Sequence, residues 1–123
     1  MEAGTVETAD RNDVALRGRL AAAAEVRELP SGDAVATFRL IVGRDPRDGP
    51  TRADGKRGAT VDTLDCSAWR SPARRQVVRW QPGDVVEVEG SLRRRFYRAA
   101  GAPVSRWDVL VRQARRVARA PAE

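Results

Sequence analysis

Residues 82–97 read Pro-Gly-Asp-Val-Val-Glu-Val-Glu-Gly-Ser-Leu-Arg-Arg-Arg-Phe-Tyr, a turn followed by an alternating strand. The apolar or small side of this alternation consists of Val86, Val88, Gly90 and Leu92. The opposite side consists of Glu87, Glu89, Ser91, Arg93, Arg95 and Tyr97. A period of two is typical of a strand with one buried face. We therefore predict a strand from about residue 84, with the arginines and the tyrosine facing outward.

The segment before this strand predicts one short amphipathic helix. Ser71-Pro72 is a favourable helix start, with Ser71 as N-cap and Pro72 at the first helical position. Pro82-Gly83 then stops the helix. The apolar positions recur at helical spacing and are Ala73, Val77 and Trp80. We interpret these three residues, Trp80 included, as core.

Three further segments alternate with period two. They are expected at 14–20 (resuming at 26–29), 34–42 and 61–69. Their inward-facing residues are predicted to be Val14, Leu16, Gly18, Leu20, Ala36, Phe38, Leu40, Val42, Leu64, Cys66 and Ala68. The stretch 43–60 carries glycine, proline, arginine and aspartate without apolar periodicity, which predicts a long mobile loop between two strands.

A turn at 99–103 and a strand at 104–117 complete the pattern. The expected order is five strands with one helix between the third and the fourth. This is the order of an all-β OB-fold, a five-stranded Greek-key barrel. The chain of 123 residues suits one domain. We expect a flexible acidic leader at 1–11, the barrel at 12–117 and a short basic tail at 118–123.

The charge distribution points to a polyanionic partner. The chain holds 23 basic and 17 acidic residues, a net charge of +6. Nine arginines and one acid, Asp108, fall between residues 93 and 119. A basic surface of this kind is typical of nucleic-acid binding. A solubility device or an arginine-favouring genome are the alternatives, and Lys56 is the only lysine.

Residue types that the chain lacks exclude several function classes. There is no histidine, which removes most general-base, triad and zinc schemes. No P-loop is present and the acids are scattered, so we expect neither an enzyme nor a cofactor or metal site. Cys66, the single cysteine, cannot form an intramolecular disulfide, and we interpret it as a buried small hydrophobe. Without an apolar span or a signal sequence, we expect a cytoplasmic protein.

Two blocks of sequence resemble the bacterial single-stranded DNA-binding proteins. The first comprises 12–20, 25–27, 29–32 and 34–40, and the second is 82–93. The resemblance extends over about 12–117. It implies an OB-fold, usually a homotetramer with a dimer as the other option, that binds single-stranded DNA in replication, recombination and repair.

The chain departs from that family's pattern in its aromatic residues and at its end. By residue matching, Trp69 and Tyr97 stand where two of the family's stacking aromatics lie, whereas Pro46 and Thr63 occupy two other such positions. The loop at 43–60 carries no aromatic residue. The chain ends at residues 119–123 without the acidic tip by which housekeeping members recruit repair proteins. The resemblance therefore implies a divergent paralogue.

The outward faces of the strands supply the candidate site. Sequence-independent binding of single strands needs cations for phosphates and flat rings for bases. The candidate nucleic-acid-binding residues are Trp69, Tyr97, Arg93, Arg95, Arg39, Thr37, Arg17 and Arg19. Asp65 falls on the same face, and we expect it to pair with Arg39 across the strands. Phe96 is expected in the core, and Trp107 is left open between core, interface and base contact.

Two other functions fit the same sequence. RNA binding is one, because base stacking does not depend on the sugar. A protein-contact module, such as an adaptor in primosome assembly, is the other. The small number of aromatic residues favours the adaptor, and the basic last third favours nucleic acid.

Overall fold

The computed structural model describes residues 7–49 and 58–122. Its elements are β1 (Val14–Leu20), β2 (Glu25–Glu28), β3 (Ala34–Gly43), the 3-10 helix η1 (Pro46–Asp48), β4 (Val61–Ala68), α2 (Ser71–Val77), β5 (Val85–Ala99) and β6 (Ala102–Ala118). No helix in these described ranges has the length and apolar character needed to cross a membrane.

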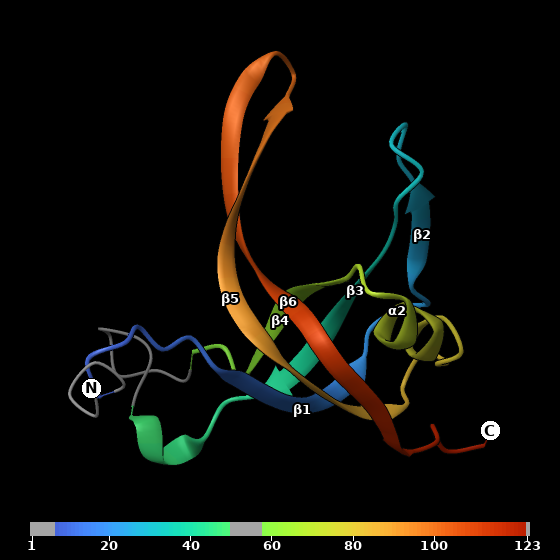
Figure 1. Ribbon diagram of the computed structural model, residues 1–123. Helices are drawn as coiled ribbons and strands as arrows, with labels where there is room; N and C mark the ends of the chain where they lie inside the picture. Colours follow the sequence, from blue (N-terminus) through green and yellow to red (C-terminus); the bar gives the residue numbers. More distant parts are fainter. Residues whose placement is uncertain (1–6, 50–57, 123) are drawn as a thin grey trace.

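Five of the strands close into a barrel. Their order is β1-β5-β6-β4-β3, and two residue pairs between β1 and β3, Arg19 with Ile41 and Leu20 with Leu40, close the ring. All pairings are antiparallel except β4 with β6. The barrel, with the helix α2 between β4 and β5, confirms the OB-fold prediction (Figure 1).

The inward-facing residues of the strands form the core together with α2. The deeply buried members predicted from the alternation are Leu20, Ala36, Phe38, Leu40, Cys66, Ala68, Val86 and Val88. The helix adds Ala73 and Val77, and β6 adds Val109 and Val111. Trp80 meets the edge of Phe38, with 5.6 Å between ring centroids. This confirms Trp80 as core, although it lies in the turn after α2 rather than on the helix.

One glycine allows two strands to pack closely. Gly90 lies on the inward face of β5, next to an irregularity in the pairing with β6. A Cβ atom at Gly90 would stand 1.8 Å from the Leu110 carbonyl oxygen. Only glycine fits this crossing of β5 and β6.

The turn before β5 is tied to the end of β6 by a buried carboxylate. Asp84 is 1% exposed and accepts hydrogen bonds from the backbone N–H groups of Gln81 (2.8 Å) and Ala120 (2.7 Å). Arg116 lies 3.5 Å from the same carboxylate. The Gln81 bond is the largest of the causes that lower the pKa of Asp84. The turn that leads into β5 thus also fixes the chain after β6.

Two hairpins project from the same end of the barrel (Figure 1). One is β2 with the first half of β3, paired from Glu25–Thr37 to Glu28–Ala34. The other is the outer part of β5 and β6, residues 91–109, which we call the arm. Its tip is a two-residue turn, Ala100-Gly101, with φ of 53° and 79°. Positive φ at both positions is the mark of the type I′ turn that suits a twisted hairpin.

Several details differ from the sequence-based expectations. β2 is a separate strand in a hairpin, not a continuation of β1. The N-cap of α2 is Arg70, whereas Ser71 is the first helical residue. Phe96 is 77% exposed, so its prediction as core was wrong: the arm extends past the barrel, where both of its faces meet solvent. Within the expected loop, Arg52, Lys56 and Arg57 lie outside the described residues, and Arg44 pairs with Asp62 at 2.8 Å.

Candidate nucleic-acid interface

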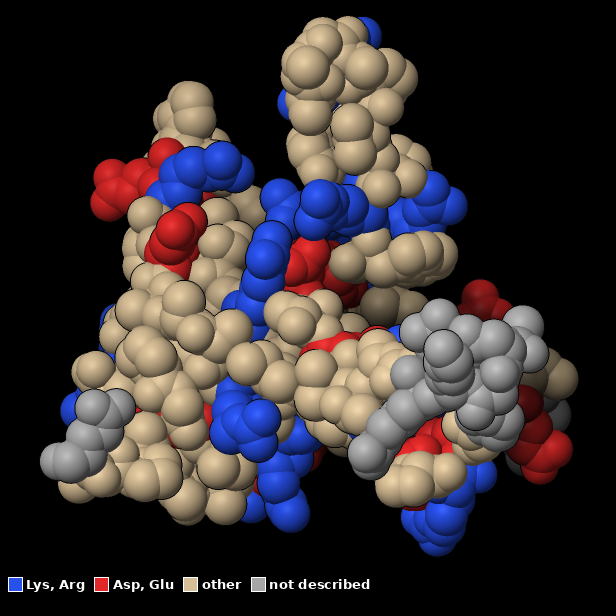
Figure 2. All heavy atoms as spheres, turned by 180° about the vertical axis from the view of Figure 1, so that it is seen from behind, with Lys and Arg blue, Asp and Glu red and all other residues tan. Residues whose placement is uncertain are grey.

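A groove of about 730 Å³ lies between the two projecting hairpins. Five strands contribute to it, and its polar and aromatic lining includes Arg27, Thr37, Arg39, Asp65, Arg95, Tyr97 and Arg106. Figure 2 shows basic side chains gathered in the hollow between the projections, with acidic atoms beneath them. The groove is therefore a concave surface lined by charged side chains of both signs.

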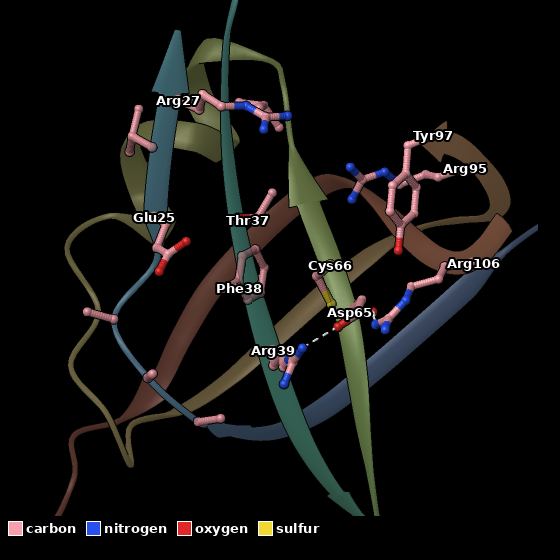
Figure 3. Close-up of a pocket in the computed structure, with 15 residues that line it drawn as sticks. Glu25, Arg27, Thr37, Phe38, Arg39, Asp65, Cys66, Arg95, Tyr97 and Arg106 are labelled. Atoms are coloured by element: carbon pink, nitrogen blue, oxygen red, sulfur yellow. Dashed lines mark hydrogen bonds and ion pairs between the residues drawn. The ribbon is translucent and has the colours of Figure 1, made fainter. Parts of the chain in front are cut away.

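Strand register explains why these side chains face the same way. Arg39 stands opposite Asp65 on β3 and β4, and Arg95 stands opposite Arg106 on β5 and β6. Residues directly opposite each other in a sheet project from the same face. The predicted outward faces of β3, β4 and β5 therefore meet in one groove (Figure 3).

A buried carboxylate lies beneath the arginines of β5. Asp108 is 2% exposed and accepts a hydrogen bond from the Ser67 hydroxyl at 2.8 Å. Arg93 donates from Nε to the same carboxylate at 3.1 Å, and an Arg95 nitrogen lies 3.8 Å from it. Asp108 thus holds two of the predicted phosphate-binding residues in place and neutralises part of their charge.

A second carboxylate orients the other arginines of the groove. Arg39 donates to Asp65 at 3.1 Å, which confirms the expected cross-strand pair, and Arg106 lies 3.6 Å from the other Asp65 oxygen (Figure 3). Arg39 and Arg106 remain 61% and 57% exposed. Their guanidinium groups can therefore contact a ligand without leaving the carboxylate.

The two predicted stacking rings lie on the barrel exterior but in different surroundings. Tyr97 is 38% exposed and lines the groove, with the Arg95 guanidinium 6.0 Å from its ring centroid. Trp69 follows β4, is partly exposed and does not line the groove. Its indole Nε1 is enclosed without a hydrogen-bond partner. Two rings are among the described residues that line the groove, and of these Phe38 is buried in the core while Tyr97 is exposed enough to stack on a base.

The two candidate arginines of β1 lie apart from the groove. Arg17 stands opposite Glu87 on β5, and their side chains are hydrogen-bonded at 2.7 Å. Arg115 pairs with Glu87 from the other side at 2.6 Å. The hydrogen bond from Arg17 is the largest of the causes that lower the pKa of Glu87. Arg19 shares the outward parity of Arg17, so the structure places both on another face of the barrel rather than in the groove.

Sequence reasoning missed Arg27, Arg106 and the central role of Asp108. For Arg106 and Asp108 the missing information was the register between β5 and β6, which pairs Arg93 with Asp108 and Arg95 with Arg106. Arg27 lies on β2, which the sequence did not predict as a separate strand. Placing the two-residue turn at 100–101 would have supplied this register, because a tight hairpin aligns residues symmetrically about its turn.

We expect the Cys66 thiol to be unreactive in the folded protein. The residue is 2% exposed, and burial, helped by the charges of Asp108 and Asp65, raises the pKa of Cys66 to about 12. The thiolate is the reactive form, and at neutral pH almost none is present. A disulfide reagent such as DTNB should label the protein quickly in denaturant and very slowly without it. Rapid labelling without denaturant would contradict this burial.

Comparison with known proteins places the chain among proteins of one type. Residues 11–117 match the family model described as "Single-strand binding protein family". The chain is 37% identical over 86 residues to "Single-stranded DNA-binding protein 2" of Listeria innocua, covering 70% of this chain and 50% of that protein. It is 38% identical over 87 residues to "Single-stranded DNA-binding protein" of Streptococcus pyogenes, covering 70% and 49%. The chain thus spans about half the length of the curated relatives it matches.

A solved structure has the same fold. The "Plasmodium falciparum SSB complex with ssDNA" aligns with a TM-score of 0.67 at 20% identity, covering 86% of this chain and 92% of that one. At this identity the match concerns the fold of the barrel.

Proposed function

Because the chain belongs to the single-strand binding protein family, we propose that it binds single-stranded DNA independently of base sequence. Bases stack on Tyr97 in the groove and on Trp69 outside it. Phosphates are neutralised by Arg39, Arg95 and Arg106. The role is one of binding rather than catalysis.

One observation carries this proposal. A flat, partly exposed ring and several guanidinium groups share one concave surface about Tyr97. Flat rings accept any base by its face, and arginines accept any phosphate, so the combination recognises single strands without reading their sequence. A duplex hides the faces of its bases and offers only its phosphates.

The assembly and the biological role proposed here rest on the family, and the cytoplasmic location rests on the sequence prediction. We infer a homo-oligomer, tetramer or dimer, that acts in DNA replication, recombination and repair in the cytoplasm. The adaptor function is the second candidate, favoured by the single stacking ring in the groove.

An anisotropy titration compares binding to fluorescently labelled oligo-dT, a duplex and an RNA of equal length. Oligo-dT should bind, and its log K should fall with log salt by about 0.7 per phosphate neutralised. The duplex should bind much more weakly. Equal affinity for the duplex would contradict base stacking. No binding to any strand would favour the adaptor function. Preference for the RNA would favour RNA binding over DNA binding.

Replacing Tyr97 by alanine should weaken oligo-dT binding by about 1–2 kcal/mol, because one base loses its stacking partner. The matched control is Tyr97→Phe, which keeps the ring and should bind nearly as well as the wild type. The same titration measures all three proteins. An unchanged affinity for Tyr97→Ala would remove this ring from the site.

A further inference from the structure

The arm carries a second aromatic surface, which faces away from the groove. On β5 and β6, Arg94 stands opposite Trp107 and Phe96 stands opposite Ser105. The Arg94 guanidinium lies 5.5 Å from the Phe96 ring centroid and 5.1 Å from that of Trp107, and it donates a hydrogen bond to the Ser105 hydroxyl. We call the surface formed by these four residues the back face of the arm.

Both rings of the back face are open to solvent. Phe96 is 77% exposed and Trp107 is 57% exposed, more than Tyr97 in the groove. Large aromatic side chains at such exposure lose the free energy that burial would provide. The Arg94 guanidinium lies near both rings, where it can stabilise them only in part.

The charge of the back face differs from that of the groove. Arg95, which lines the groove, and Arg93, which does not, share the carboxylate of Asp108. Among the described residues, Arg94 has no carboxylate partner. The residues of 91–109 with the parity of the back face are Leu92, Arg94, Phe96, Arg98, Pro103, Ser105, Trp107 and Val109, and none is acidic.

This charge pattern favours a polyanion over a second copy of the chain as the binding partner of the back face. A two-fold symmetric contact would place the back face against itself. Arg94 and Arg98 would then meet cations and no acid, which is unfavourable in a desolvated interface. A nucleic-acid strand offers both missing partners, phosphates for the guanidinium groups and base faces for the rings.

We propose that the back face of the arm is a second stacking site for the bases of a single strand. The inference rests on the proposed function and extends it. Phe96 and Tyr97 are neighbours in β5 and project from opposite faces of a two-stranded ribbon, so one strand that passes around the arm can contact both. The arm is then enclosed by the ligand rather than forming one wall of a groove.

The first test measures affinity for oligo-dT of about 16 nucleotides, the upper end of the range covered by one OB-fold. The double variant Phe96→Ala, Trp107→Ala should bind about 5- to 150-fold more weakly for each stacked base lost. The control Phe96→Tyr, Trp107→Phe keeps two rings and should bind like the wild type. Arg94→Ala should reduce the salt slope by about 0.7. Thermal unfolding verifies that all variants fold, since the changed side chains lie outside the core.

The second test locates the bases directly. Oligo-dT in which 5-iodouracil replaces single thymines is photocrosslinked to the wild type, and mass spectrometry identifies the attached residues. Crosslinks at Phe96 or Trp107 support the second site. Crosslinks confined to Tyr97 and Trp69, together with unchanged affinity of the double alanine variant, overturn it and leave the proposed function intact. Failure of the wild type to bind any single strand would instead contradict the proposed function.

Sedimentation tests whether the back face is instead a contact between protein chains. If the double alanine variant changes its oligomeric state while its affinity for oligo-dT stays that of the wild type, the back face is a protein contact and the inference is wrong. An unchanged oligomeric state with weakened binding supports it.

Discussion

The Gly90→Ala variant is expected to lose about 3 kcal/mol or more of its free energy of unfolding, and to unfold about 10–15 °C below the wild type. The added Cβ would stand 1.8 Å from the Leu110 carbonyl oxygen and 2.8 Å from its carbonyl carbon. Both contacts are with backbone, so no side-chain rotation can relieve them. The strands β5 and β6 must separate, and they carry core residues on either side of this point.

Gly43→Ala is the matched control for this substitution. Gly43 lies in the last pair of β3 with β4, and a Cβ atom added there would meet no heavy atom within 4 Å. Its backbone φ is not positive. Alanine there should leave stability unchanged or raise it by up to about 1 kcal/mol through the unfolded state. Thermal unfolding followed by circular dichroism compares the two, and equal melting temperatures would refute the close-packing argument.

The Asp108→Asn variant is expected to lose stability and to gain affinity for single strands. In the wild type, the Asp108 carboxylate is 2% exposed and accepts hydrogen bonds from the Ser67 hydroxyl and the Arg93 Nε–H. Hydrogen bonds to charged groups contribute about 1.5–3 kcal/mol each. We therefore expect a free-energy loss of about 2–3 kcal/mol. Removing one negative charge beneath Arg93 and Arg95 leaves more of their charge for phosphates. A charge about 8 Å from a phosphate at an effective dielectric constant of about 40 contributes roughly 1 kcal/mol, or about fivefold in affinity at low salt.

Asp65→Asn separates the two effects. It likewise removes one negative charge beside arginines of the groove, but the Asp65 side chain is 31% exposed and its partners Arg39 and Arg106 are mostly exposed. Exposed ion pairs contribute about 0–1 kcal/mol, so stability should change little while affinity rises as in Asp108→Asn. Denaturant unfolding and low-salt anisotropy measure the two quantities. Weaker DNA binding in both variants would show that the carboxylates position the arginines more than they neutralise them.

The alternation of side chains predicted the barrel well because each strand has one buried face. The inward residues of β5, Val86 and Val88, are 0% and 1% exposed, as the period of two requires. The same parity correctly placed Thr37, Arg39, Arg95 and Tyr97 on one surface, since neighbouring strands share their faces. The period of two is therefore sufficient to predict side-chain orientation wherever one face of the strand is buried in the barrel.

The pattern fails where a strand leaves the barrel. Phe96 continues the inward parity of Val86, but at that point the arm has no core to pack against. Arg17 shows a second limit: parity predicts that it faces outward, but a closed barrel has more than one outer surface, and Arg17 pairs with Glu87 on another. The role of Asp108 required the register between two strands, which depends on where the turn falls.

Because the part of the arm that carries Phe96 and Trp107 stands clear of the packed interior, this surface and the integrity of the barrel are set by different residues. None of the residues Arg94, Phe96 and Trp107 belongs to the buried cluster that fills the barrel. Such a projection can diversify freely during evolution: related chains can acquire new ligand preferences along it while the inherited barrel stays the same.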